Sequence, residues 1–435
     1  MSERTFDAFV RTETEAEWAA RSERLSAQLA KTAAAYDRRG AFPFEHFEAL
    51  RREGFLRLTV PRRYGGEELS LYALLLVIER IARGDGSTAL GLGWHLGLML
   101  HYRESGRWPE PLLAWFARQV VEHGAMINHF ATEPKTGSPS RGGLPETRAV
   151  RVPGGYRLTG RKTFSTLAPI VRHFVVTAII EGNADGASQS PNVASPKRPE
   201  AGEANAEAAA YARAAEARLA EFLVEKGPGV RIEETWDTLG MRATGSHDVV
   251  LEEVFVPDAR FIGYRDKVDS SGKREDGDGW QLFIPAVYLG IAQAARDFAV
   301  RYAVDYRPNS LGGRSIADLP HVQTKIGEIE RDLLTARTLV YSVAERWDRD
   351  AARRAALSLD IGVAKSVATN VAIDVVDRAM RIVGGASLAR SLPLERLYRD
   401  VRAGLHNPPM DDVVIQRLAE RAIAEPEEEP RSFGV

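Results

Sequence analysis

The sequence contains no cysteine among its 435 residues. Without thiols, the chain cannot form a disulfide, attack a substrate through a thiolate, or hold a metal or cluster through cysteine ligands. These classes of covalent, redox and metal chemistry are excluded before any motif is considered.

Charge of one sign and long apolar runs are also lacking. Lys and Arg number 58 against 60 Asp and Glu, so the basic stripe of a nucleic-acid binder is not expected. No stretch approaches the roughly 20 apolar residues of a membrane span. Residues 1–18 mix both charges and have no apolar core, so they do not resemble a secretory signal. We therefore expect a cytoplasmic enzyme with no nucleic-acid partner and no membrane span.

The chain is long enough for two or three domains, and 44% of its residues are hydrophobic. Apolar spacing predicts that the first domain, residues 1–125, is helical. Residues 13–36 are rich in good helix formers. Residues 70–84 have a wide apolar face and begin with Ser70, a plausible N-cap.

A β domain is predicted from residue 126 to residue 260. Residues 149–158 read as a hairpin around a Pro-Gly-Gly turn, and short apolar runs that follow read as further strands. Residues 182–218 are rich in Gly, Ala, Ser, Pro and Glu. They predict a peripheral insertion with an exposed helix in its second half.

Helical spacing returns in a third domain, residues 261–435. Apolar residues recur at steps of three and four in 319–343, which marks one buried face. Residues 356–383 are apolar on more than one side, which is typical of a helix buried between other helices or in a subunit interface.

Four phrases occur in order along this helix–sheet–helix pattern. They are ATEPKTGS at 131–138, GRKTFST at 160–166, LGMRATGS at 239–246 and PLERLYRD at 393–400. Together they resemble the acyl-CoA dehydrogenase superfamily, and four ordered matches are far more specific than any one. The resemblance implies an α+β fold with an N-terminal helical domain, a middle β-barrel-like domain and a C-terminal four-helix bundle.

This resemblance also implies a flavin, whose isoalloxazine ring needs fixed hydrogen-bonding groups at its edge. By resemblance, Thr132 and Thr166 contact the ring and Phe164 packs where the family has a tryptophan. Ser138 lies towards phosphate or substrate. The alternative for Thr132 and Ser138 is that they only shape a Pro/Gly turn.

The resemblance is less complete for the residues that would bind the end of the cofactor away from the flavin ring. In the family, a neighbouring subunit supplies an arginine, and a glutamine precedes a Gly-Gly pair. Here Arg307 is shifted by about two residues, and Arg381 replaces the glutamine ahead of Gly384 and Gly385. Arg381 could pair with a pyrophosphate. FAD is the expected cofactor, FMN is possible, and a homotetramer is expected because neighbouring subunits complete the flavin site.

The glutamate that serves most of the family as catalytic base is missing. Its matching position holds Pro408, and the alternative position used by a minority of the family falls near Trp280. Because a base must lie within reach of its proton, a shifted carboxylate such as Asp411 would have to replace it. Asp411 and its neighbour Asp412 could instead cap the following helix.

His406 lies near the position of the missing base. In this respect the sequence resembles the monooxygenase branch of the superfamily. That branch carries a histidine in this region, a serine around Ser165 and a histidine for which His95 is the candidate. A histidine beside a flavin can hold and relay protons during oxygen chemistry, and Ser165 could donate to the ring. The alternative is that His406 and His95 are buried histidines with all their hydrogen bonds made within the protein. Ser165 would then be an ordinary hydroxyl at the end of a strand.

Three hypotheses follow. The first is a reduced-flavin monooxygenase, partnered by a flavin reductase. The second is an FAD-dependent acyl-CoA dehydrogenase that uses a shifted carboxylate and an electron-transfer flavoprotein. The third is a flavin-binding relative without activity. The substrate, a small molecule or an acyl-CoA, is expected to contact residues 85–101, the loop 131–139 and the helix beginning near Trp280.

Overall fold

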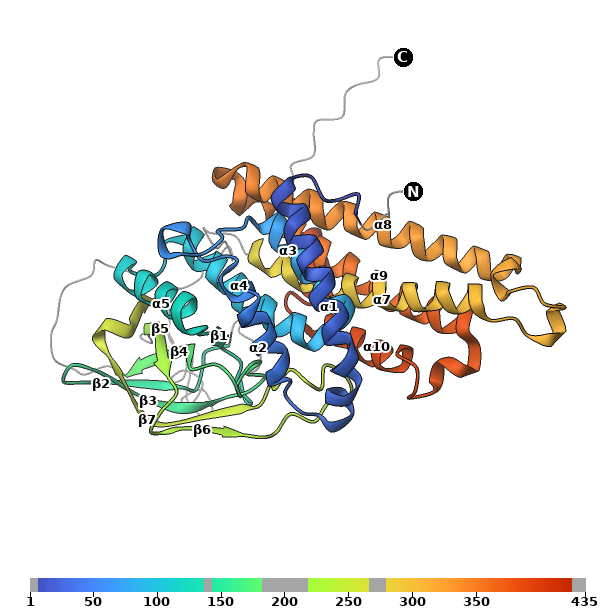
Figure 1. Ribbon diagram of the computed structural model, residues 1–435. Helices are drawn as coiled ribbons and strands as arrows, with labels where there is room; N and C mark the ends of the chain where they lie inside the picture. The colour runs from blue at the N-terminus through green and yellow to red at the C-terminus, as the bar shows by residue number, and fades with distance from the viewer. Residues whose placement is uncertain (1–6, 137–142, 182–217, 266–278, 425–435) are drawn as a thin grey trace, which may run out of the picture.

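The computed structural model describes residues 7–136, 143–181, 218–265 and 279–424. Ser138 and almost all of the expected insertion at 182–218, including its expected helix, lie outside the described residues. The element order is helical, then β, then helical (Figure 1), so the expected α+β architecture is confirmed.

Five helices precede the sheet: α1 Glu13–Arg39, α2 Phe44–Arg52, α3 Leu71–Gly84, α4 Gly86–Ser105 and α5 Glu110–His123. Thr12 and Glu15 form a capping box at the start of α1. The Ser70 side chain accepts a hydrogen bond from the backbone of Ala73, so the predicted N-cap of α3 is confirmed. These caps satisfy amide groups that would otherwise lack partners.

The middle part is one sheet. Its strands are β1 Ile127–Phe130, β2 Arg148–Val152, β3 Gly155–Lys162, β4 His173–Glu181, β5 Arg218–Glu225, β6 Val230–Glu233, β7 Asp248–Pro257 and β8 Phe261–Tyr264. The order is β6-β7-β3-β2-β4-β5-β8, and β1 pairs in parallel with β4. Val152 pairs with Gly155, which confirms the predicted hairpin.

Long helices dominate the last part: α7 Phe283–Asp305, α8 Pro320–Arg349, α9 Ser358–Val383, and the shorter α10 Leu394–Val401 and α11 Asp411–Ala424. The apolar face predicted for 319–343 is largely buried in α8. Glu79 of α3 accepts hydrogen bonds from Arg337 and Tyr341 of α8, at 2.6 and 2.7 Å. The N-terminal and C-terminal helices therefore share a core.

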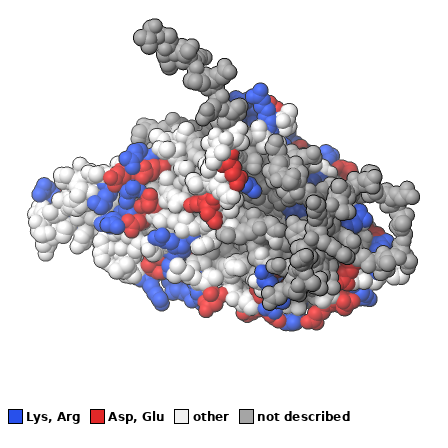
Figure 2. All heavy atoms as spheres, turned by 180° about the vertical axis from the view of Figure 1, so that it is seen from behind, with Lys and Arg blue, Asp and Glu red and all other residues white. Residues whose placement is uncertain are grey.

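The surface agrees with the balanced composition. On the face shown in Figure 2, the described Lys and Arg side chains lie among Asp and Glu side chains and form no single-sign patch. Within the described ranges, no helix has both the length and the apolar character needed to cross a membrane.

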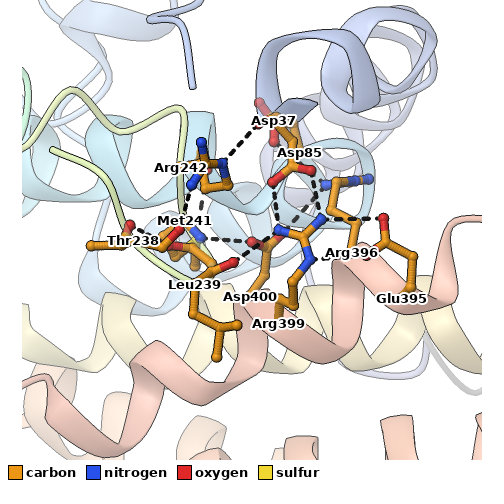
Figure 3. A network of polar contacts seen from close by, with 12 residues as sticks. Asp37, Asp85, Thr238, Leu239, Met241, Arg242, Glu395, Arg396, Arg399 and Asp400 are labelled. Atoms are coloured by element: carbon orange, nitrogen blue, oxygen red, sulfur yellow. Dashed lines mark hydrogen bonds and ion pairs between the residues drawn. The ribbon is translucent and has the colours of Figure 1, made fainter. Parts of the chain in front are cut away.

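A buried ionic network joins the three parts (Figure 3). Arg396 of α10 lies 3.4 Å from an Asp400 oxygen and 3.8 Å from an oxygen of Asp85, which precedes α4. Asp400 also accepts the backbone N–H of Met241, in the loop before β7, at 2.7 Å. At Gly240, a Cβ atom would lie 2.3 Å from the Arg399 carbonyl oxygen. The LGMR and PLERLYRD phrases thus meet each other.

The network continues to the first helix. Arg399 binds both carboxylate oxygens of Asp37 in α1, at 2.9 and 2.6 Å, and donates to the Leu239 carbonyl. Arg242 donates to the backbone carbonyl of Asp37 at 3.0 Å. Bidentate Arg–carboxylate pairs are among the stronger polar contacts, so this pair fixes α1 against α10.

We predict that Asp400 makes stability depend on pH. Burial raises the pKa of Asp400 to about 6, against the opposing attraction of Arg396. Since this folded-state pKa lies above the value near 4 of an unfolded chain, the native state holds an extra proton between them. Its stability therefore decreases as the pH rises from about 4 to about 6. Asp400→Asn should remove on the order of 2 kcal/mol of this dependence.

Urea unfolding at several pH values between 4.5 and 7 measures the effect. Asp377→Asn, which alters an exposed surface pair with Arg381, is the matched control and should keep the wild-type slope. Parallel curves for wild type and Asp400→Asn would contradict the assignment.

Candidate functional site

The candidate site begins with two adjacent loops. The backbone N–H of Thr163 donates to the Thr132 carbonyl at 2.9 Å, which places the ATEP and GRKTFST phrases side by side. Their charged members pair inside the sheet, where Lys162 donates to Glu133 and both side chains are buried. Although burial acts to raise it, the pKa of Glu133 is lowered by Lys162 and Thr147. Glu133 and Lys162 therefore pair with each other and have a structural role.

Residues 164–166 have the features of a ligand-binding loop. Phe164 is 63% exposed and has a left-handed backbone conformation (φ 54°). Its ring packs edge-on against Trp236, with 5.7 Å between the ring centroids. Ser165 is fully buried, yet its hydroxyl has no hydrogen-bond partner. An unpaired buried hydroxyl and a strained, exposed aromatic residue are both costly in the absence of a ligand. The loop therefore fits a flat, polar aromatic group such as an isoalloxazine.

Thr166 is nearly buried and belongs to a row of hydroxyls. Its Oγ1 lies 2.8 Å from Ser246 Oγ, which lies 2.7 Å from Thr244 Oγ1. Sequence reasoning quoted the LGMRATGS phrase but assigned no role to Ser246 or Thr244. Ser246 lies 80 residues from Thr166 in the chain, so their contact could be seen only in the folded structure.

His95 is buried in α4 and lines neither of the two described clefts. Its Nε2 donates to the Leu56 carbonyl at 2.8 Å, and its Nδ1 accepts the Ile127 N–H at 3.2 Å. Both ring nitrogens are thus used by the backbone. His95 is thus a buried histidine whose hydrogen bonds are satisfied by the backbone, and we assign it no functional role.

His406 and Asp411 lie on either side of the proline pair Pro408–Pro409. His406 ends the 3-10 helix Arg402–His406 and is exposed. Asp411 is in the first turn of α11, where it accepts Asn370 Nδ2 at 2.7 Å and lies 3.8 Å from Lys365 Nζ. Lys365 is buried, and burial lowers its pKa. Asp411 is therefore held to α9 through Oδ2, whereas its buried Oδ1 faces Lys365 without a hydrogen bond.

The residues expected at the other end of the cofactor lie at helix ends. Arg307 is exposed just beyond α7, whose end Figure 1 shows far from the sheet. Arg381 is exposed in the last turn of α9 and pairs with Asp377 at 2.7 Å. Gly384 follows with a positive φ of 70°, and Gly385 is also exposed. Their exposure suits contact with a neighbouring subunit, which stays a prediction.

One described cleft, about 210 Å³ in volume, lies near the start of α7. His101 and Trp280, which belong to two of the segments predicted to contact substrate, line it together with Glu104. Trp347 and Arg354 also line it, and sequence reasoning missed them because they come from the end of α8 and the segment after it.

Comparison with known proteins agrees with this geometry. Residues 12–106 match the family described as acyl-CoA dehydrogenase, N-terminal domain, and residues 282–407 match its C-terminal domain. The chain is 44% identical to the putative acyl-CoA dehydrogenase YdbM of Bacillus subtilis, over 95% of this chain and 98% of that one. It is 32% identical to the amino sugar nitrososynthase DnmZ of Streptomyces peucetius, over 85% and 83%.

Among solved structures, KijD3 in complex with FMN and an amino-keto dTDP-sugar superimposes with a TM-score of 0.77. It is 27% identical, and 96% of each chain is covered. Fold, loop and relatives define a flavin-dependent oxidoreductase. The chain belongs to the acyl-CoA dehydrogenase family.

We predict that His95 stays neutral through the physiological range. Burial lowers the pKa of His95 to about 4. Because the folded-state pKa lies below the unfolded value near 6.5, its contribution to stability is complete above pH 6.5 and is lost as the pH falls towards 4. The His95 ring resonance, assigned by comparison with His95→Gln, should not shift between pH 8 and pH 5. A midpoint near 6.5 would disprove the buried, neutral arrangement.

Proposed function

We propose that this protein is a reduced-flavin monooxygenase. In the proposed reaction, a separate flavin reductase supplies reduced flavin. Reduced flavin, O₂ and substrate then give oxidised flavin, water and a product that carries one added oxygen atom. The bound flavin would supply the electrons and the reaction with oxygen. The side chains of this protein would bind and orient the flavin and hold a proton beside it.

The observation that carries this proposal is the binding of Asp411 to α9. A dehydrogenase needs a carboxylate free to take a substrate proton. Pro408 holds the usual position, and the nearest shifted candidate accepts Asn370 and faces the buried Lys365. The described residues 279–290 at the start of α7 contain no carboxylate, and Glu104, which lines the cleft beside Trp280, is paired with Arg354 and accepts from Trp347. A monooxygenase needs no base at either position.

The described loop supports the choice of cofactor. Ser165 and Thr166 would hydrogen-bond the ring edge, Thr132 would lie beside them, and Phe164 would pack on the ring. We propose FMN as the flavin, because KijD3 is 27% identical and its structure contains FMN. FAD is the alternative. With FAD, Arg307, Arg381, Gly384 and Gly385 of a neighbouring subunit in a homotetramer would bind its distal part.

His406 is proposed to hold a proton beside the flavin. It lies two residues before Pro408 and is exposed in the single chain, so a bound ligand can reach it. A histidine exchanges its proton near neutral pH and can donate and accept without a metal. The relative DnmZ, named as a nitrososynthase, supports oxygen transfer as a chemistry within reach of this fold.

The second candidate function is an acyl-CoA dehydrogenase. The name of YdbM, at 44% identity, favours it. Asp411 would then have to leave Asn370 and turn towards the substrate, with an electron-transfer flavoprotein as the electron acceptor. The two functions differ in what reduces the flavin.

An anaerobic titration of the FMN-loaded protein distinguishes them. We expect that a panel of short, branched and aromatic acyl-CoA thioesters leaves the flavin absorbance unchanged, whereas a flavin reductase with NADH reduces it. Mixing the reduced protein with O₂ should then give a transient near-ultraviolet absorbance before oxidised flavin appears. His406→Ala should shorten its lifetime by about tenfold or more, because a positioned proton donor is lost.

His123→Ala, which alters an exposed histidine of α5, is the control and should leave the transient unchanged. Bleaching by an acyl-CoA that disappears in Asp411→Asn but persists in Asp412→Asn would establish the dehydrogenase instead.

A further inference from the structure

A buried tyrosine holds the turn that carries His406. Tyr288 of α7 is fully buried, and its Oη lies 2.5 Å from Oδ1 of Asn407, the residue that follows His406. Within the described ranges, this is the one hydrogen bond that a side chain makes between residues 402–410 and the rest of the chain. The turn therefore has a single side-chain anchor of this kind, and it comes from another helix.

Burial also explains why Tyr288 is the donor in this hydrogen bond. Burial raises the pKa of Tyr288 above its ordinary value, so the hydroxyl keeps its proton. A buried hydroxyl proton needs an acceptor, and Asn407 Oδ1 is the one that the described residues offer. The amide group of Asn407 therefore cannot turn away without leaving the tyrosine proton unpaired.

The ring of Tyr288 makes a second contact with the same turn. Gly404 is buried, and a Cβ atom there would lie 3.1 Å from both Tyr288 Cδ2 and Thr369 Cγ2. The backbone at residue 404 therefore packs directly on the tyrosine ring, with no room for a side chain between them. Tyr288 thus contacts the turn on both sides of His406, at residue 404 through its ring and at residue 407 through its hydroxyl.

His406 has no polar anchor of its own. Its side chain is exposed, and its imidazole makes no hydrogen bond or ion pair with the described residues. An exposed side chain without partners changes rotamer freely, so the backbone that carries it decides which region the ring can reach. The reach of the imidazole therefore depends on the 404–407 turn, and the place of that turn depends on Tyr288.

We propose that Tyr288 is a positioning residue, which holds the 404–407 turn so that His406 keeps its proton beside the bound ligand. This inference rests on the proposed function in that His406 must serve a bound flavin. It deepens that function, because proton donors work only when they are held close to the productive geometry, and here a buried side chain that carries no proton to the ligand does the holding.

The first measurement needs no flavin. Hydrogen–deuterium exchange, read by mass spectrometry on peptides that contain residues 402–410, reports how often the turn opens. Tyr288→Phe keeps the ring against Gly404 but removes the hydroxyl, and it should speed exchange in this segment about fivefold. Asn407→Leu has a similar size and no acceptor, and it should give the same increase. The double variant should exchange no faster than either single variant, because all three lack the same hydrogen bond.

The second measurement follows the transient near-ultraviolet absorbance after the FMN-reduced protein is mixed with O₂. Tyr288→Phe should shorten its lifetime by about threefold or more, while the affinity for oxidised FMN stays at the wild-type value. In a His406→Ala background the same change should have no further effect, because the residue that Tyr288 positions is already absent.

Tyr72→Phe is the matched control. It removes another buried tyrosine hydroxyl, which donates to the Phe9 carbonyl at 2.8 Å. It should lower stability in the same way but change neither exchange at residues 402–410 nor the lifetime of the transient.

The outcomes are distinguishable from those of the proposed function. If Tyr288→Phe leaves the exchange or the lifetime unchanged, or shortens the lifetime equally in the wild-type and His406→Ala backgrounds, the inference is overturned even if the protein is a monooxygenase. If wild type gives no transient, the monooxygenase proposal fails and the role of His406 fails with it. The exchange data alone then decide whether Tyr288 holds the turn.

Discussion

Two buried carboxylates share one guanidinium where the three parts of the chain meet. Arg396 lies between Asp85 and Asp400, and Asp400 also holds the backbone N–H of Met241. Removing the guanidinium would leave two buried carboxylates with too few partners, which is among the costliest changes to a protein interior. Because the loop that begins at Met241 carries Ser246, this contact fixes the hydroxyl row against α4 and α10. The proposed flavin-binding loop therefore packs against residues that this ion pair holds in place.

The motifs also contain both residues with a structural role and residues proposed to bind the flavin. In ATEP and GRKTFST, the charged residues Glu133 and Lys162 bind each other inside the sheet. Beside them, Phe164 is exposed and the hydroxyl of Ser165 has no hydrogen-bond partner. The phrases that first indicated the family are thus partly structural, and we propose that their uncharged members bind the flavin.

Local and periodic features could be predicted from the sequence, and long-range contacts could not. The β2–β3 hairpin, the Ser70 cap and the buried face of α8 depend on neighbouring residues, and all were predicted. The partners of Asp411 come from α9, with Asn370 lying 41 residues earlier in the chain. His95 looked like a candidate ligand contact because its sequence neighbours gave no hint that Leu56 and Ile127 would occupy both ring nitrogens. The hydroxyl row likewise joins residues 80 positions apart.

The central claim is that the 164–166 loop binds the flavin through its two adjacent hydroxyls. A crystal structure of the protein grown with reduced FMN under anaerobic conditions tests it most directly. The account predicts the ring packed by Phe164, with Ser165 Oγ and Thr166 Oγ1 each about 3 Å from a polar atom of the ring edge. A flavin bound elsewhere, or a Ser165 hydroxyl that donates to the protein while the ring lies out of its reach, would contradict the account.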